Sequence, residues 1–417
     1  MLITYCYRIK PNPEQVVIMD NWLELLRRHY NYALGQRLDW LRRTRCQIDR
    51  CSTVSQPIGE IPDKVDYYTQ QSDLKQTKQL FPNYKNIWAE SQQVNLQRLD
   101  KAWKKWLFPD KSGKRGGRPK FKKSGQMRSF VFPRVNNPKA GAFLENGVLR
   151  LSKIGPMPVI MHRPLPVGFN LKQATIVKKA DGWYVCLSLE DDTVPSPLPL
   201  DEVKSTVGVD VGLKEFLTTS LGETVPASKP YRTAQNHLAR QQKFLSRKHK
   251  GSNGYKKLQN KIARIHQRVG RVRENFHYNT AHKLVKRYDL IAVEDLNIRG
   301  LARTPLGKSI LDVAWGSFIH KLEAVAVKCS VHVVKVNPHG TTVDCSNCGA
   351  KVPKTLSMRT HECHKCNAVI DRDENAARNI LQRALNAVGL MVSAGGGLGD
   401  AQPMKPEAWG WNGVQTT

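Results

Sequence analysis

Two apolar segments, far apart in the chain, each end in an acidic residue. T-V-G-V-D runs from residue 206 to Asp210, and L-I-A-V-E runs from residue 290 to Glu294. Uninterrupted apolar runs of this length are typical of strands in a sheet that is covered on both faces. A third acid, Asp373, opens the segment D-E-N-A-A-R-N-I, which has the pattern of a first helical turn. The chain is therefore expected to fold around a sheet with carboxylates at its edge.

Three carboxylates without a neighbouring histidine or cysteine suit Mg²⁺, which prefers hard oxygen ligands. Two Mg²⁺ ions about 3.5–4 Å apart can position a water and stabilise the phosphorus and the leaving oxygen of a phosphodiester. Without a cation, clustered acids repel one another, and at least one takes up a proton. We therefore interpret Asp210, Glu294 and Asp373 as catalytic ligands for two Mg²⁺ ions in a nuclease site. Each acid alone is also explained as a turn residue, a solvated charge or a helix cap.

Two neighbouring acids, Asp295 and Asp371, are alternative ligands. Glu294 is preferred to Asp295 because it alternates with Ala292 toward one face of the strand. Asp373 is preferred to Asp371 because it leads directly into the helical segment. Asp371 is then expected to act as a helix cap or to support the site indirectly.

Four cysteines precede the third acid in two C-x-x-C pairs. They are Cys345, Cys348, Cys363 and Cys366. Four sulfurs match a closed tetrahedral zinc site, which is structural and contributes on the order of 10 kcal/mol to ordering its segment. The remaining five cysteines are scattered and are predicted to be ordinary thiols of a reducing compartment. These are Cys6, Cys46, Cys51, Cys186 and Cys329.

The formal net charge is +31, from 66 Lys and Arg against 35 Asp and Glu. Such an excess destabilises a compact state by self-repulsion, and nucleic acid is the simplest compensating partner. An anionic membrane surface is the rival explanation. No apolar run reaches about 18 residues and no signal peptide opens the chain. The expectation is a soluble protein of the cytoplasm or nucleoid, with no membrane and no small-molecule substrate.

The positive charge is concentrated in two runs. Residues 104–123 hold nine basic residues against one acid, with Gly and Pro throughout, and are predicted to form a flexible basic loop. Residues 229–288 hold seventeen basic residues and only Glu274 as an acid. Within that run, apolar residues repeat in steps of four and three, which indicates a narrow seam on a long helix with a cationic outer face. The seam consists of Leu258, Ile262, Ile265, Val269, Val272 and Phe276.

Twelve side chains of these runs are candidate nucleic-acid contacts. They are Lys114, Arg115, Arg118, Lys120, Lys122, Lys123, Arg247, Lys248, Lys257, Lys261, Arg264 and Arg268. A solvated charged face is the plain alternative for either run alone. Trp103, Trp106 and Phe108 lie beside the first run and are able to stack bases, although at least two of them are better explained as helix core.

The N-terminal half combines helices with β-like runs. A short strand at 3–9 precedes a helix from Asn12 to about residue 45, and a second helix covers about 84–107. Short alternating runs between 128 and 190, separated by Gly, Pro and Asn, predict a small β-barrel into which the first strand pairs. Prolines mark its end, at Pro195, Pro197 and Pro199.

The C-terminal half has an α/β pattern. A hairpin after residue 206 is followed by the basic helical insertion, a buried strand, one amphipathic helix at 309–329 and another strand. The last helix covers about 373–387, and the tail after Gly389 is predicted to be disordered.

Several of these segments together resemble the TnpB family of insertion sequences. They are Y-R-I-K-P-N-P-E-Q at 7–15, G-R-P-K-F-K-K at 117–123, G-V-D-V-G at 208–212, V-E-D-L at 293–296, C-S-N-C-G at 345–349 and D-R-D-E-N-A-A-R-N-I at 371–380. The family's members are RNA-guided DNA endonucleases related to compact type V CRISPR effectors. One departure is local: the family's T-S-Q before the first cysteine pair is replaced by the sequence T-T-V-D at 341–344.

The resemblance implies an RNase H-like (RuvC) nuclease domain with an inserted zinc ribbon, and an N-terminal β-barrel (wedge) that carries a helical recognition lobe. The implied parts are the first barrel strand at 1–10, the lobe at 11–108, the barrel with its basic loop at 109–195, the nuclease at 200–340, the ribbon at 341–370, the final nuclease helix at 371–388 and the disordered tail at 389–417.

By the same resemblance, a guide RNA would specify the site in double-stranded DNA, which is opened to single strands and cut beside a short flanking motif. Two alternatives remain. One is a compact type V CRISPR effector, and the other is an RNA-guided repressor that binds DNA without cutting it.

Overall fold

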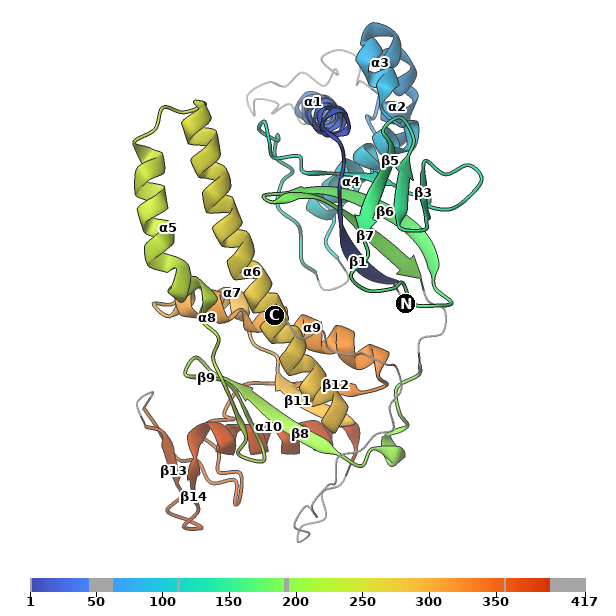
Figure 1. Ribbon diagram of the computed structural model, residues 1–417. Helices are drawn as coiled ribbons and strands as arrows, with labels where there is room; N and C mark the ends of the chain where they lie inside the picture. The colour runs from blue at the N-terminus through green and yellow to red at the C-terminus, as the bar shows by residue number, and fades with distance from the viewer. Residues whose placement is uncertain (1, 45–62, 111–112, 191–194, 356–357, 391–417) are drawn as a thin grey trace, which may run out of the picture. The chain divides into compact units, whose positions relative to one another are not determined.

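The computed structural model describes residues 2–44, 63–110, 113–190, 195–355 and 358–390. The chain divides into two compact units, Met1–Thr193 and Val194–Thr417 (Figure 1). Cys46, Cys51 and almost all of the tail that is expected to be disordered lie outside the described residues.

The N-terminal unit is built on one seven-stranded sheet in which every neighbouring pair is antiparallel. Its strands are β1 (Leu2–Ile9), β2 (Ser129–Phe132), β3 (Ala142–Glu145), β4 (Val148–Leu151), β5 (Gly155–Ile160), β6 (Asn170–Lys179) and β7 (Gly182–Glu190), in the order β2-β6-β7-β1-β5-β4-β3. The first strand therefore pairs inside the later β segment, as expected. A bridge from Val135, just beyond β2, to Ala142 in β3 connects the two ends of the sheet.

A disulfide joins two of the cysteines that were predicted to be ordinary thiols. Cys6 in β1 lies directly opposite Cys186 in β7, with a Cα–Cα distance of 4.1 Å, and the two are bonded. The prediction was wrong for this pair because the strand register, which a single sequence does not give, places residues 180 positions apart side by side. Cys329 is exposed and not disulfide-bonded, as expected.

Helices cover this sheet. They are α1 (Pro13–Thr44), α2 (Tyr67–Ser72), α3 (Leu74–Leu80), the 3₁₀ helix η1 (Pro82–Asn86) and α4 (Ala89–Leu107). Asn12 caps α1: its side chain accepts the Gln15 N–H at 2.8 Å, and the Gln15 side chain accepts the Asn12 N–H at 3.0 Å. The second long helix begins at Ala89 rather than near 84, because Pro82 opens a separate 3₁₀ turn.

The C-terminal unit contains a five-stranded mixed sheet. Its strands are β8 (Thr206–Val211), β9 (Glu215–Thr219), β10 (Thr224–Pro226), β11 (Leu290–Glu294) and β12 (His332–Val336), in the order β10-β9-β8-β11-β12. The first three strands form an antiparallel meander, and β11 and β12 then add in parallel to β8. The predicted hairpin, the predicted buried strand and the strand that follows the 309–329 segment are confirmed, and all five residues of β11 are buried.

Helices lie on both faces of this sheet (Figure 1). They are α5 (Pro230–Ser246), α6 (Asn253–Arg287), α7 (Ile298–Leu301), α8 (Gly307–Val313), α9 (Trp315–Lys328) and α10 (Arg372–Val388), besides the 3₁₀ turn η2 (Leu200–Glu202). Helices α6, α8 and α9 pack on one face with Ile291 and Val293. Helix α10 packs on the opposite face with Ala292 and Val336.

The predicted apolar seam lies on one long helix, α6, as expected, and the basic insertion contains a second helix, α5, before it. One helix prediction needs correction. The helix expected at 309–329 is broken at Ala314, whose φ of 57° is left-handed. Just before this break, the buried Asp312 side chain accepts the Tyr231 and Arg232 N–H groups at 2.9 and 3.0 Å, which caps α5. No helix within the described residues is long and apolar enough to cross a membrane.

Candidate active site and metal centre

Asp210 and Glu294 lie at the same end of neighbouring parallel strands. The strand register pairs Val293 with Val209, so each acid is the next residue of its strand. Side chains alternate between the faces of a strand. Asp210 therefore shares a face with Gly208, and Glu294 shares one with Ala292, which packs against α10. Both carboxylates are on the α10 face of the sheet, where sequence alternation placed Glu294.

Helix α10 reaches this face because small residues allow a close approach. A methyl group on Gly208 would lie 2.0 Å from the Ala377 carbonyl oxygen and 2.9 Å from Leu381 Cβ. Ala376 and Ala377 are almost fully buried on the helix side. The backbone of α10 thus rests directly on β8, and its first turn, which contains Asp373, is held near the strand ends.

The three acids interact electrostatically. Desolvation of its carboxyl group raises the pKa of Asp210 well above its usual range, and the charges of Glu294 and then Asp373 raise it further, against an opposing effect of Arg372. Burial also raises the pKa of Glu294, although a Thr341 hydrogen bond and the charge of Arg383 act in the other direction. The fold therefore disfavours ionisation of Asp210.

Among the described residues, Asp373 is the one acid of the three that has charged partners within hydrogen-bond distance. Arg359 Nη1 lies 3.2 Å from Asp373 Oδ2, and Arg372 Nη2 lies 2.9 Å from Oδ1. The three carboxylates do not form a cluster as tight as the four cysteines, whose sulfurs all lie within 4.8 Å of one another. Two guanidinium groups therefore lie directly beside Asp373.

The neighbouring acids occupy different positions. Asp371 caps α10: its Oδ1 accepts the Asp373 N–H at 2.8 Å and the Glu374 N–H at 3.2 Å. Asp295 is exposed, whereas Glu294 is only 9% exposed. The structure thus gives Asp371 the capping position that the sequence suggested, and it leaves Asp295 outside the group of interacting carboxylates.

A threonine that sequence reasoning did not select holds Glu294. The hydroxyl of Thr341, a residue only 1% exposed, donates to Glu294 Oε1 at 2.6 Å. The Asn379 side chain in turn donates to the Thr341 carbonyl at 2.8 Å and to the Asp344 carbonyl at 2.7 Å. Thr341 is the first residue of the segment T-T-V-D that stands in place of the family's T-S-Q.

A second asparagine of α10 holds the start of the cysteine segment. Asn375 is fully buried, donates to the Asp344 carbonyl at 2.9 Å and accepts the Ser346 N–H at 2.9 Å. Asn375 and Asn379 are four residues apart and so lie on one face of the helix. That spacing in D-E-N-A-A-R-N-I was the available sequence signal for these two residues.

The four paired cysteines converge. Cys345 and Cys366 Sγ are 3.7 Å apart, and Cys348 and Cys363 Sγ are 3.5 Å apart. Four sulfurs bound to zinc at about 2.3 Å would be separated by about 3.8 Å at the corners of a tetrahedron. None of the four is disulfide-bonded. The arrangement therefore fits a tetrahedral metal ion.

Both cysteine pairs are turns with the same backbone pattern. The Cys345 N–H donates to Ala350, and the Cys363 N–H donates to Ala368. A residue with positive φ follows each second cysteine, Gly349 at 72° and Asn367 at 57°. A short hairpin of β13 (Thr360–Glu362) and β14 (Val369–Asp371) leads from this cluster into α10. The cluster is thus connected directly to the turn that contains Asp373.

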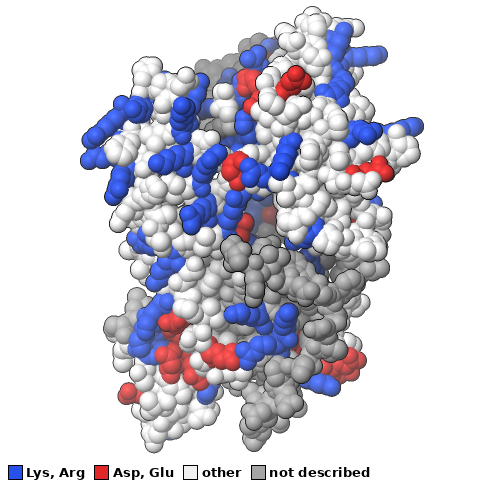
Figure 2. Space-filling view, in the orientation of Figure 1, with Lys and Arg blue, Asp and Glu red and all other residues white. Residues whose placement is uncertain are grey.

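The candidate nucleic-acid contacts are exposed, with one exception. Figure 2 shows Lys and Arg side chains gathered over α5 and α6; four of the twelve candidates lie on α6 and two more, Arg247 and Lys248, in the connection between the helices. Lys122 differs, because its Nζ lies 4.6 Å from the centre of the Tyr30 ring, and burial lowers the pKa of its amine.

The basic loop is also less free than predicted. The Lys122 carbonyl accepts bonds from Arg27 and Asn31, and the Gly116 N–H donates to Lys105. The prediction of a flexible loop is therefore wrong for these points of attachment, which polar side chains of α1 and a carbonyl of α4 provide. Of the nearby aromatics, Trp103 is buried, Trp106 packs partly against the core and Phe108 is 63% exposed.

Three family models match the chain. One described as a probable transposase covers residues 184–304, one described as a Cas12f1-like TNB domain covers 315–380, and one described as a helix-turn-helix domain covers 1–46. The TnpB-like protein L79 of Acanthamoeba polyphaga mimivirus is 30% identical over 238 residues, which cover 51% of this chain and 45% of that protein.

A protein of Streptomyces pristinaespiralis, described as a putative RNA-guided DNA endonuclease, is 30% identical over 401 residues. The match covers 94% of this chain and 90% of the relative. The chain belongs to the TnpB family. Within this TnpB-family chain, the stretch matched by the helix-turn-helix model consists of the strand β1 and the single long helix α1 in the described part, 2–44.

The fold of this TnpB-family chain also resembles that of a solved structure. The cryo-EM structure of a Cas12f1–sgRNA–target DNA complex contains a chain that aligns with a TM-score of 0.50 at 14% identity. The alignment covers 88% of this chain and 82% of the other. The two therefore share an overall mixed α/β fold.

Proposed function

We propose that this protein is an RNA-guided DNA endonuclease of an insertion sequence, and that Asp210, Glu294 and Asp373 form its catalytic centre. The single observation that carries the proposal is geometric: β8 and β11 end side by side in Asp210 and Glu294, and α10, whose first turn contains Asp373, packs on the face that these two acids share. Burial of the Asp210 carboxyl group, and then repulsion by Glu294 and Asp373, raises its pKa. The relative from Streptomyces pristinaespiralis supports the guide-directed activity.

The donor set fits a divalent cation. All three side chains offer carboxylate oxygens, which Mg²⁺ prefers, and a bound cation would remove the repulsion that raises the pKa of Asp210. Asp210, Glu294 and Asp373 would hold Mg²⁺, which would activate water and stabilise the charge that develops on the scissile phosphate.

The chain's own residues prepare this centre. The Thr341 hydroxyl fixes the orientation of Glu294, and Asn379 fixes Thr341. Arg359 and Arg372 balance the charge of Asp373 and lie where a phosphate approaching that carboxylate would meet them. The four cysteines would hold zinc, and this would fix the hairpin that leads to Asp373.

The remaining parts are proposed to have the roles that the resemblance implies. The antiparallel meander followed by two parallel strands is the strand order expected of an RNase H-like nuclease. The N-terminal sheet and the helices that cover it would be the wedge and the recognition lobe, which read a short motif beside the target. The cationic side chains over α5 and α6 would bind the guide RNA and the opened DNA strands.

The test uses the full-length protein with the RNA that co-purifies with it, after that RNA has been sequenced to design a matched DNA target. Asp210→Ala and Glu294→Gln are each expected to abolish cleavage and to retain binding of RNA and DNA. Asp295→Asn is the matched control, because this exposed acid is adjacent to Glu294 and is expected to leave cleavage unchanged.

Two outcomes would refute the proposal. Cleavage retained by Asp210→Ala would show that the acids are not the catalytic centre. A wild-type complex that binds matched DNA in Mg²⁺ but never cuts it would instead establish a guide-directed repressor.

A further inference from the structure

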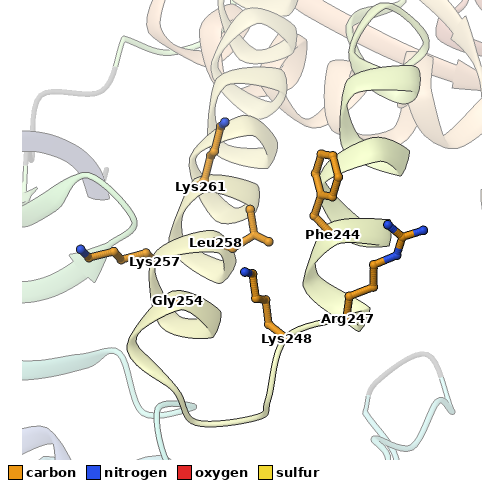
Figure 3. Close-up of a pocket in the computed structure, with 7 residues that line it drawn as sticks. All are labelled: Phe244, Arg247, Lys248, Gly254, Lys257, Leu258 and Lys261. Atoms are coloured by element: carbon orange, nitrogen blue, oxygen red, sulfur yellow. The ribbon is translucent and has the colours of Figure 1, made fainter.

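The end of the α5–α6 helix pair contains a cavity. It has a volume of about 580 Å³ and lies beside the connection between the two helices (Figure 3). Its lining consists of Phe244, Arg247, Lys248, Gly254, Lys257, Leu258 and Lys261. A volume of this size lies within the range of sites that bind small organic groups, about 300–1,000 Å³.

The lining combines an apolar part with positive charge. Figure 3 shows Phe244 on α5 and Leu258 on α6 directed into the space between the helices, with Lys248 rising beside them from the connection. Phe244 is 46% exposed, which leaves part of its ring face uncovered. Within the described part of the chain, no acidic side chain lines the cavity. The cavity therefore presents an aromatic ring and several cationic side chains to a ligand, and no carboxylate among the described residues that line it.

The four cations, Arg247, Lys248, Lys257 and Lys261, have no ion pair with an acid among the described residues. Like charges gathered on a short stretch destabilise the fold unless an external anion meets them. A duplex backbone alone would satisfy the cations, but it would leave the exposed Phe244 ring without a role. A nucleotide whose base has left the stack satisfies both, because the base has a flat π face and the phosphates carry charge.

We propose that this cavity binds one unstacked nucleotide, with its base against Phe244 and Leu258 and its flanking phosphates held by the four cations. The inference rests on the proposed function and deepens it, because it assigns one site on the helix pair to a single nucleotide of a bound strand. Guide RNA and opened DNA share the chemistry of such a nucleotide, and the experiment distinguishes these two sources.

The decisive experiment is photocrosslinking of the full-length protein to single strands of 20 nucleotides that contain 5-iodouracil, one of RNA and one of DNA. Mass spectrometry then maps the crosslinked residues. A crosslink at Phe244 with one strand and not with the other identifies the source, and crosslinks with both show that the site accepts either strand. A 20-base-pair duplex of the same sequence is expected to give none at Phe244.

Affinity provides the second measurement. Phe244→Ala is expected to weaken single-strand binding about 5- to 150-fold, the usual effect of removing one stacking partner. Phe244→Tyr keeps the ring and is expected to bind like the wild type. Val272→Ala is the matched control, because Val272 is also 46% exposed on α6 but does not line this cavity. Lys248→Ala is expected to reduce the slope of log affinity against log salt by about 0.7.

Two results overturn the inference: no crosslink at Phe244 with either strand, or equal affinity of Phe244→Ala and the wild type. These results are distinct from failure of the proposed function, in which the wild type would bind its RNA and matched DNA but would not cut the DNA. A wild type that cuts normally, together with an inert Phe244, would disprove the nucleotide site alone.

Discussion

Thr341→Val is the most informative single substitution near the proposed catalytic centre. Valine keeps the shape of threonine but replaces the hydroxyl that donates to Glu294 Oε1 at 2.6 Å. A hydrogen bond to a charged group contributes about 1.5–3 kcal/mol. At about 1.4 kcal/mol for each factor of ten, its loss corresponds to a cleavage rate about 10- to 150-fold lower. Residues that orient metal ligands have effects of similar size.

The assay is single-turnover cleavage of matched DNA by the RNA-loaded protein over a range of Mg²⁺ concentrations. Thr341→Val is expected to cut more slowly and to need more Mg²⁺, whereas Thr341→Ser, which keeps the hydroxyl, is expected to resemble the wild type. Thr342→Val is the neighbouring control. Equal zinc content and equal thermal midpoints would exclude misfolding. A valine variant as fast as the serine variant would refute the positioning role.

Four further results are expected. Asp210→Asn should raise the thermal midpoint of the protein in buffer without divalent cations. The raised pKa of Asp210 makes its ionisation in the folded state costly, so wild-type stability falls as the pH rises above about 4. A midpoint that is unchanged or lower in the variant contradicts this expectation. Elemental analysis should find one zinc ion per chain in the wild type and less in Cys345→Ser. Wild-type protein that contains no zinc when purified would contradict a zinc site at the four cysteines. Burial lowers the pKa of His29 to about 4. Its contribution to stability, about 3 kcal/mol, is therefore present above about pH 6.5 and is lost as the pH falls toward 4. Denaturant titrations should show that His29→Leu loses less unfolding free energy than the wild type over this pH range, and an equal loss would contradict the role given to His29. Gly208→Ala should destabilise the C-terminal unit by about 1–3 kcal/mol or more, because its methyl group would meet the Ala377 carbonyl; an unchanged denaturation midpoint would show that α10 adjusts freely.

Local patterns were sufficient for part of the site. Asp210 and Glu294 end apolar runs, and the parallel pairing of those runs places both at one edge of the sheet. The spacing of the four cysteines also predicted their convergence. These predictions succeeded because strand alternation and metal-ligand spacing are short-range rules that one sequence displays directly.

The contacts that sequence reasoning missed depend on long-range geometry. Thr341 reaches Glu294 from 47 residues away, and the Cys6–Cys186 bond depends on the register of strands 180 positions apart. Sequence reasoning did not select Phe244, which shares its cavity with Leu258 only because α5 and α6 pack side by side. The helix break at Ala314 could not be predicted either, because the apolar spacing continues through it. The contact beside the break is long-range, since Asp312 caps α5 by accepting the N–H groups of Tyr231 and Arg232.

The central claim is that Asp210, Glu294 and Asp373 share bound divalent cations. A crystal structure of the full-length protein grown with Mn²⁺, with the metal located by its anomalous scattering, tests this claim most directly. The account predicts metal peaks in contact with all three carboxylates, with Arg359 and Arg372 withdrawn from at least one oxygen of Asp373. Manganese absent from this position, with both arginines still paired to Asp373, would contradict it.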